Sequence, residues 1–542
     1  MKHFYEKNSE FLKSKVNKTF DELLAMSEPE FVTWVKEMRK TVVHYWDTKG
    51  QPPRVGYDEH EIVKQFNEMT SFPTHNFLVT DEHTGIDDAI FTGNLTGNAV
   101  NQWFPTMMKT RINYSIDSDS GKSIYDYFAR DDLANTFTLY AHRHFRRDSF
   151  YNYSQTIEKG KLIDNVGGNL RYRTTNIKEF VEWFENNARA YNTHDYWFEP
   201  SSDDKQAYSG FNDNLSSVEY MSITRDELLK LNCRPETLAN INHGDEMAKY
   251  TTRPYENANV FRVRLYKKNQ KIFPKGFQAF RVSYCQYAVN FPPLIAKFLY
   301  EKYTTSIKDQ EQINIYDPSS GWGGRLLGAL SIDDNKNINY IGTDPNTDHN
   351  IENGKTKYHD IAEFFNTKTY RATGLFPKVH SYEIFQHGSE EIHKDEKFQK
   401  YKGKIDLIFT SPPYFSKEAY SEDDTQSYKK FTTYDIWRDE FLKKTLETCV
   451  EWLREDRYLL WNIADVTYSK KNLCLPLEQD SIDILKSLGM EYKGVLKMCL
   501  AQMPGKNRVD SDTGVPTTKN FCKINGKWRK YEPIFVFHKK SS

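Results

Sequence analysis

Apolar and polar positions change their spacing along the chain, and this spacing predicts where helices and strands lie. In the first 70 residues, apolar side chains recur at helical intervals within Phe20–Leu24 and Phe31–Val35, and another helix is predicted from Glu59 to Met69. In the second half, short apolar runs stand between turn-forming residues, which is typical of buried strands. The chain is therefore expected to begin with helices and to end in an α/β unit.

The strand pattern also suggests where the chain divides. Lys267–Lys271 is a predicted turn between two strands, Val260–Tyr266 and Ile272–Phe280. At 542 residues, the chain is long enough for more than one domain. We therefore predict an N-terminal domain over residues 1–260, helical at its start and mixed afterwards, and a C-terminal α/β domain over residues 261–542.

A strand, a glycine-containing turn and a helix start follow one another from Ile313. The strand leads into Asp317, and Gly321 and Gly323 leave room for a ligand to approach the backbone. The next strand ends at Asp344, about twenty residues beyond the glycines, where a ribose-binding acid would stand. No dinucleotide fingerprint is present, and Asp317 would repel a pyrophosphate but attract a cationic ligand. An ordinary βαβ turn is the structural alternative.

A second block, Thr410–Tyr414, follows the apolar strand Ile405–Phe409 directly. Its two prolines fix their own φ angles and donate no backbone hydrogen bond. The corner therefore presents free carbonyl acceptors and the Tyr414 ring at the end of a strand, which suits a planar group that carries an amine, such as a nucleobase. A rigid turn whose tyrosine merely packs is the alternative.

Together, the two blocks resemble the S-adenosylmethionine-dependent DNA amino-methyltransferases, which make N4-methylcytosine or N6-methyladenine. Asn290–Ile295 is similar to the segment that packs over the cofactor in this family, Gln386–Glu390 to the end of its third strand, and Tyr531–Lys539 to its final strand. The resemblance covers roughly residues 275–542. It implies a Rossmann-like methyltransferase fold, a mixed seven-stranded sheet with helices on both faces, behind a partly helical N-terminal domain.

The resemblance also assigns roles to individual residues. In the catalytic motif Ser411-Pro412-Pro413-Tyr414, the Ser411 hydroxyl and the Pro412 carbonyl would accept the amino protons, and Tyr414 would stack on a flipped base, with Phe415 as a second wall. The implied cofactor is S-adenosylmethionine, and no metal is expected. The implied cofactor-binding residues are Phe291, Asp317, Ser319, Gly321, Gly323, Asp344, Ser389 and Glu390.

The residue at the start of the catalytic motif favours one base. Serine at position 411 is more typical of the cytosine-N4 enzymes, whereas adenine-N6 enzymes usually carry Asp or Asn there. We therefore predict methylation of cytosine N4, with adenine N6 as the nearest alternative. Methylation of RNA or of a protein glutamine amide, and a catalytically silent DNA-binding protein with the same fold, are further alternatives.

Two basic segments are candidates for contact with double-stranded DNA. The first contains Arg143, Arg146 and Arg147, with Phe145 available for packing on sugar or base, and the second contains Lys506 and Arg508. A solvated helix face and a plain hairpin are the respective alternatives. Too few residues follow the catalytic motif for a recognition domain, so residues 1–260 are expected to recognise the target.

Composition adds limits on the protein's class. Hydrophobic residues make up 38% of the chain, enough for substantial cores, and the net charge of −1 means that a DNA-binding face must be local. The six cysteines include no C-x-x-C pair, and the chain has no apolar run of membrane-spanning length. We therefore expect an intracellular, cytoplasmic protein that binds neither metal nor membrane, and we read Ser120–Ser123 as a surface turn. A cognate restriction endonuclease and the oligomeric state stay open.

Overall fold

The computed structural model describes most of both halves of the chain. It describes residues 10–53, 57–92, 98–116, 120–142, 145, 197–198, 218–224, 260–266, 271–274, 277, 280–281, 284–307, 311–332, 336–368, 380–468, 473–500, 515–517 and 519–541. Contacts divide the chain into two compact units. The sheet unit contains Gly56–Tyr125 and Gln286–Ser542, and the helical unit contains Lys7–Val55 and Asp126–Cys285.

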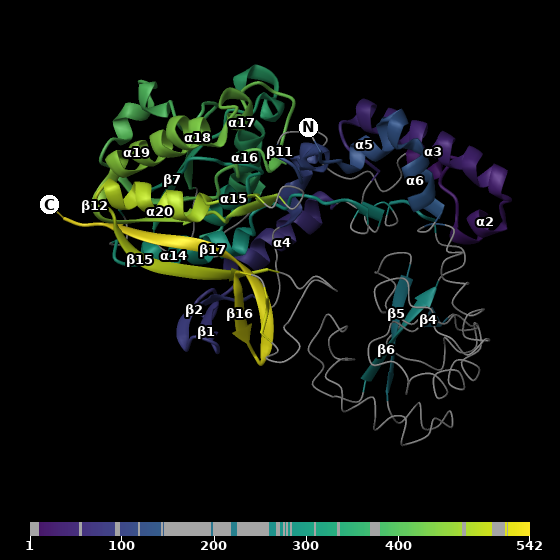
Figure 1. Ribbon diagram of the computed structural model, residues 1–542, viewed down its shortest axis with the longest axis horizontal. Helices are drawn as coiled ribbons and strands as arrows, with labels where there is room; N and C mark the ends of the chain where they lie inside the picture. The colour runs from purple at the N-terminus through teal and green to yellow at the C-terminus, as the bar shows by residue number, and fades with distance from the viewer. Residues whose placement is uncertain are drawn as a thin grey trace. The chain divides into compact units, whose positions relative to one another are not determined.

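The sheet unit is built on one large mixed sheet (Figure 1). Its first five strands in spatial order are parallel, the next strand is antiparallel to both of its neighbours, and this arrangement confirms the predicted Rossmann-like fold. The order is β9 (Ser381–Phe385), β8 (Asn337–Thr343), β7 (Gln312–Asp317), β10 (Ile405–Thr410), β12 (Leu453–Asn462), β17 (Lys527–Lys539) and β15 (Glu491–Cys499).

Side-chain alternation along the central strands explains why both faces of the sheet are covered. Ile315 and Leu407 belong to a buried cluster with helices α14 (Pro293–Tyr303), α15 (Gly324–Leu330) and α16 (Lys357–Lys368). The residues that follow them, Tyr316 and Ile408, belong to a second cluster with α19 (Lys443–Trp452) and α20 (Leu477–Ser487). Successive residues of a strand point to opposite faces, so each apolar run supplies both cores.

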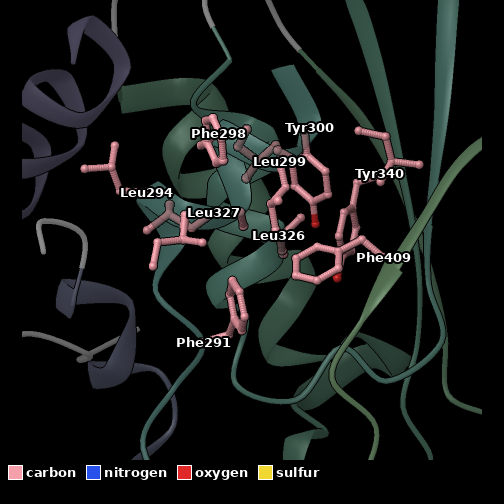
Figure 2. Packing of buried hydrophobic residues seen from close by; sticks show 14 of the residues in the cluster. Phe291, Leu294, Phe298, Leu299, Tyr300, Leu326, Leu327, Tyr340 and Phe409 are labelled. Carbon is pink, nitrogen blue, oxygen red and sulfur yellow. The ribbon is translucent and has the colours of Figure 1, made fainter. Parts of the chain in front are cut away.

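Figure 2 shows the first of these clusters from close by. Leu326 and Leu327 of α15 lie among Phe291, Tyr300 and Phe409, and the Phe291 and Phe409 rings meet edge-on at 5.1 Å. The segment that the sequence placed over the cofactor is therefore packed directly against the strand that leads into the catalytic motif.

Two N-terminal strands extend the sheet beyond the predicted seven strands. β2 (Ile86–Ile90) pairs with β15 in parallel, and β1 (Leu78–Asp81) pairs with β2. The buried Lys497 amine of β15 lies 2.7 Å from Asp81 and 2.9 Å from Asp88, so an ion triad joins the added strands to the sheet. A short strand, β16 (Phe521–Ile524), pairs with the start of β17.

The remaining elements of the sheet unit are short or flank the sheet. Helix α4 packs on α16, where the Phe66 and Phe365 rings stack at 4.5 Å. The elements are α4 (Glu59–Ser71), η1 (Asn98–Gln102), η2 (Pro105–Lys109), β3 (Arg111–Ile112), η6 (Thr347–His349), η7 (Glu352–Gly354), η8 (Ile392–Lys394), η9 (Phe398–Tyr401), β11 (Glu418–Ala419), α17 (Ser427–Lys430), α18 (Tyr434–Trp437), η10 (Arg438–Leu442), β13 (Val466–Tyr468) and β14 (Leu473–Leu475).

The helical unit begins with the helices that the sequence predicted. The longest of them starts at a capping box, in which the Ser27 backbone N–H donates to Glu30 at 2.7 Å, and ends at Gly50 with a φ of 69°. Its described elements are α1 (Glu10–Lys13), α2 (Phe20–Ala25), α3 (Glu28–Lys49), η3 (Asp131–Leu133), α6 (Ala134–Ala141), β4 (Trp197–Phe198), β5 (Val218–Thr224) and β6 (Val260–Tyr266), and α5 (Ile124–Ala129) spans the boundary between the units.

Two sequence interpretations in this unit are wrong. The strand predicted over 272–280 is absent from the described residues there, because Phe277 and Phe280 have helical backbone and the spacing of the aromatic residues suits a helix. Phe145 is not available to DNA, because its ring is buried and stacks on Phe280 at 5.5 Å. In both cases a buried aromatic residue was misinterpreted: Phe277 and Phe280 as parts of a strand, and Phe145 as a contact for DNA.

The compact units do not follow the predicted boundary at residue 260. Residues of the N-terminal half belong to the sheet unit, because β1 and β2 pair with its edge and α4 covers α16. The role of residues 1–260 in target recognition stays a prediction.

Candidate active site

The glycine turn after β7 is held tightly against β8. The Ser320 backbone N–H donates to the Thr343 carbonyl at 2.9 Å, and the Thr343 hydroxyl donates to the Pro318 carbonyl at 2.7 Å. Gly321 and Gly323 have positive φ angles of 57° and 72°, which residues with a Cβ rarely adopt. Gly321 is partly exposed at the carboxyl edge of the sheet, whereas Gly323 is buried against Ile361 and Phe104.

Asp317 is the buried centre of this edge. Its carboxylate accepts hydrogen bonds from Arg325 at 2.8 Å, from the Tyr340 hydroxyl at 2.6 Å and from the Thr410 hydroxyl at 2.7 Å. The carboxylate has no exposed surface. Asp317 thus joins three adjacent strands, and its predicted contact with the methionine amine of a cofactor stays a prediction.

The contact between Asp317 and Thr410 joins the two sequence motifs. Thr410 is the last residue of β10 and immediately precedes Ser411, and β10 lies beside β7 in the sheet. The glycine turn and the proline corner therefore meet at one edge, where open α/β sheets bind their ligands.

Asp344 ends β8 within reach of the glycine turn. Its carboxylate accepts from the backbone N–H groups of Gly321 at 2.9 Å and Asn346 at 3.0 Å, and it keeps 12% of its side chain exposed. Burial raises the pKa of Asp344 to about 6, and burial lowers the pKa of the neighbouring His349 to about 3. Two backbone N–H groups thus hold the Asp344 carboxylate in place, and its exposed part remains accessible to a ligand.

The other predicted cofactor residues border the same strand ends. Ser319 donates its backbone N–H to Asp317 at 3.2 Å, and Phe291 lies under the Arg325 guanidinium at 5.7 Å. Ser389 and Glu390, just beyond β9, are buried, and they bind the Thr445 hydroxyl and the Lys430 amine respectively. Their side chains have partners within the protein, and their predicted contact with a cofactor adenine stays a prediction.

The catalytic motif carries a polar contact that the sequence analysis did not anticipate. The Tyr414 hydroxyl donates to the Glu532 carboxylate of β17. Phe415 does not form a second wall for a base, because its ring is buried against Tyr434 and Trp437 on the other face.

A second carboxylate lies near the motif. Glu418 accepts from the Tyr420 hydroxyl, and the Tyr420 ring meets Trp322 of the glycine turn at 5.5 Å. Burial, together with the charge of Glu532, raises the pKa of Glu418 to about 7. On β12, Asn462 gives its amide to the Pro533 carbonyl at 2.9 Å, and its buried Oδ1 has no partner among the described residues.

An N-terminal segment supports the loop that follows the catalytic motif. β3 pairs with β11, and Asn113 donates its side-chain amide to the Ser416 carbonyl at 2.9 Å. Gly121 donates to the Asn113 side chain at 2.9 Å, and Ser120 is buried and accepts from the Tyr114 backbone at 3.0 Å. The expected surface turn at 120–123 is therefore an internal brace. The sequence patterns could not have revealed this brace, because residues about 300 positions apart that contact each other leave no local pattern in the sequence.

Replacing Asn113 by alanine should weaken this brace. The change removes both side-chain hydrogen bonds and should cost about 1–3 kcal/mol of stability. Thermal unfolding and methyl-transfer assays would measure the loss, with Asn67→Ala, an exposed position of α4, as the control. Unchanged stability and activity would contradict the role of the brace.

Some sequence predictions fall outside the described residues. These are the DNA contacts predicted for Arg143, Arg146, Arg147, Lys506 and Arg508. Within the described ranges, no three potential metal ligands gather into a cluster. No described helix is long and apolar enough to cross a membrane.

Comparison with known proteins shows which family one part of the chain resembles. Residues 405–542, which begin at β10 and include the catalytic motif, match the family model of the N6/N4 DNA methylases. No curated protein matches the chain.

Similar solved structures include a proposed DNA modification methylase from Thermus thermophilus, which is 16% identical over 28% of this chain and 52% of its own, with a TM-score of 0.19. A SAM-dependent methyltransferase from Methanosarcina mazei is 11% identical over 43% of this chain and 95% of its own, with a TM-score of 0.23. This chain thus spans about half the length of the Thermus protein. Residues 405–542 of this chain are thus similar to the DNA methylases of the N6 and N4 amino-methyltransferase family.

Proposed function

We propose that this protein transfers a methyl group from S-adenosylmethionine to the exocyclic N4 of a cytosine in double-stranded DNA. The observation that carries the proposal is the Thr410–Asp317 hydrogen bond of 2.7 Å, which joins the catalytic corner to the glycine turn. The family match covers the corner and the strands after it. A ligand at the turn and a base at the corner would lie at one sheet edge.

The residues at the glycine turn fit the proposed cofactor. Gly321 presents partly exposed backbone without a side chain, and the partly exposed Asp344 carboxylate suits the two hydroxyls of a ribose. Gly323, which is buried in this structure, is a further proposed contact. S-adenosylmethionine supplies a methyl group on a cationic sulfur when bound. Phe291, Ser319, Ser389 and Glu390 are the further proposed contacts, and Asp317 supplies negative charge beneath the turn.

The catalytic corner would prepare the base amine. The base must leave the duplex, because the target nitrogen is out of reach inside the stack. Ser411 and the Pro412 carbonyl would accept the amine hydrogens, and Tyr414 would stack on the ring while Pro413 keeps the corner rigid. Fixing the amine in line with the methyl group then accounts for most of the acceleration.

The remaining assignments of the proposal concern DNA. Residues 1–260 would recognise the target and residues 261–542 would carry catalysis, with Arg143, Arg146, Arg147, Lys506 and Arg508 contacting phosphates. A cognate restriction endonuclease would be a partner if the protein protects a host genome from cleavage.

Expression in methylation-free cells, followed by nucleoside mass spectrometry of their DNA, tests the proposal. The expected product is N4-methylcytosine. N6-methyladenine would overturn the base assignment, and Ser411 would then be an exception to the family's usual residue. DNA with neither product, from cells in which the protein is soluble and binds S-adenosylmethionine, would overturn the activity.

Removing the Asp344 carboxylate should weaken cofactor binding. Asp344→Ala is expected to cost roughly 1–3 kcal/mol, the penalty for unpaired ribose hydroxyls. The pKa of Asp344 in the free protein is about 6. The ionised carboxylate, which accepts hydrogen bonds, is therefore present above pH 6 and becomes protonated as the pH falls through this value. Calorimetric titration should therefore show the affinity of the parent falling as the pH drops below this pKa. Asp344→Asn should bind weakly at every pH, and an equal pH dependence in that variant would contradict the assignment.

A further inference from the structure

Two cysteines from different strands meet where β15 and β16 both pair with β17. The Cys499 and Cys522 sulfur atoms lie 3.4 Å apart, although the residues are 23 positions apart in the sequence. Cys499 is the last residue of β15, and Cys522 belongs to β16. Two sulfur atoms in such contact need only a small movement of their side chains to reach bonding distance.

The register of the strands places both side chains on one face of the sheet. Cys499 is opposite Tyr531 of β17, and Cys522 is opposite Arg529 of the same strand. Residues two apart on a strand point to the same face, so the residues opposite them share that face as well. Backbone pairing therefore holds the two thiols together.

The surroundings bury one thiol and leave the other within reach of solvent. Cys522 is completely buried in a small cluster with Ala89 and Ile524. Cys499 lies at the border of this cluster and is partly exposed. A small oxidant can therefore reach the Cys499 sulfur, which already touches the Cys522 sulfur.

This contact also selects the product of oxidation. Once Cys499 is oxidised, the Cys522 sulfur is its nearest reaction partner. Two groups held in contact react faster than the same groups that must first meet in solution. Bond formation with Cys522 should therefore precede attack by a second oxidant molecule, which would convert Cys499 irreversibly to a sulfinic acid.

We propose that Cys499 and Cys522 form a reversible modification site that hydroperoxides oxidise to a disulfide. The Cys499 sulfur attacks a peroxide oxygen, the O–O bond breaks, and hydrogen peroxide leaves a sulfenic acid and a first water. The Cys522 sulfur then attacks the Cys499 sulfur, the S–O bond breaks, and a second water leaves. Two thiols and one peroxide thus give a disulfide and two waters, as both sulfurs are oxidised and both oxygens are reduced. A dithiol reductant in excess reverses the change.

The bond would fasten the edge of the sheet at which the N-terminal strands attach. The Lys523 backbone N–H, next to Cys522, donates to the Asp81 carboxylate of β1 at 2.9 Å. Lys497, two residues before Cys499, binds the same carboxylate at 2.7 Å. A cross-link between the two positions also reduces the conformational freedom of the unfolded chain. The oxidised protein should therefore unfold at a higher temperature than the reduced protein.

Treatment of the reduced full-length protein with one equivalent of hydrogen peroxide tests the proposal. Thiol titration in denaturant should fall from six groups to four. Peptide mass spectrometry without reductant should find one cross-linked pair, which contains Cys499 and Cys522. The melting temperature should rise on oxidation, and dithiothreitol should restore both the thiols and the original melting temperature.

Two variants separate the partners of the bond. Cys499→Ser changes the partly exposed position, and it should keep its remaining thiols and its melting temperature after the same treatment. Cys522→Ala leaves Cys499 without its partner, so Cys499 should stop at a sulfenic acid that dimedone labels. Cys474→Ser, which removes an exposed thiol on β14, is the matched control and should form the bond as the parent does.

Several results would overturn the proposal. One is a parent in which Cys499 and Cys522 stay reduced while Cys474 is oxidised, and another is a sulfinic acid at Cys499 or a bond between two chains. An oxidised protein that melts at or below the temperature of the reduced protein would also contradict it, because the bond would then distort the sheet. These measurements do not depend on methyl transfer, so they leave the proposed function to its own test.

Discussion

The double variant Pro412→Ala, Tyr414→Ala is expected to abolish methyl transfer and to leave cofactor binding intact. Alanine at 412 removes the fixed φ angle of proline, so the carbonyl of residue 412 is no longer held in position. Misplacing this acceptor of the amine hydrogens should cost about 10²-fold in rate. Alanine at 414 removes the stacking ring, worth about 1–3 kcal/mol per base. It also removes the hydroxyl that bonds to Glu532. The combined loss should exceed roughly 10³-fold.

Radiolabelled methyl transfer and calorimetric titration with S-adenosylmethionine would measure the two properties separately. The glycine turn and Asp344 are untouched by the changes, so the cofactor should bind as in the parent. Tyr382→Ala, a partly buried tyrosine of β9 away from the corner, is the control and should keep activity. Methylation at the parental rate by the double variant would remove the corner from catalysis.

Local patterns were sufficient for the central strands and for both motifs. β7, β8, β10 and β17 each carry an apolar run long enough to be recognised, because a strand buried on both faces needs apolar residues at successive positions. The glycines with positive φ stand where the turn requires them. These features depend on neighbours within a few residues, and a sequence displays such neighbours directly.

The contacts that complete the site depend on residues far apart in the chain. Lys497 pairs with Asp81 over 416 positions, and Asn113 binds the Ser416 carbonyl over 303. Each of these residues looks like an ordinary surface side chain in the sequence. Glu532 was included in a predicted strand, but its bond to Tyr414 follows from the sheet order rather than from any local pattern.

Replacing Asp317 by asparagine is the most destabilising single change that we expect. Asp317 has no exposed surface and Arg325 only 6%, and the two side chains are 2.8 Å apart. Asparagine fits the same space but leaves the guanidinium charged and buried without its counter-ion. Removing one partner of a buried pair costs about 3–5 kcal/mol. The hydrogen bonds from Tyr340 and Thr410 would also weaken.

Urea denaturation followed by tryptophan fluorescence would measure this loss. Lys355→Ala, which breaks an exposed pair with Glu363, is the control and should change the unfolding free energy by no more than about 1 kcal/mol. The variant Asp317→Asn, Arg325→Met removes the stranded charge and should regain part of the stability. The cofactor affinity of the double variant separates two roles of Asp317. If the affinity returns to that of the parent, the Asp317 carboxylate only stabilises the fold.

Continued weak binding by this stable variant would mean that the Asp317 carboxylate also attracts the cationic ligand. A loss below about 1 kcal/mol for Asp317→Asn alone would contradict the buried ion pair as the anchor of the site.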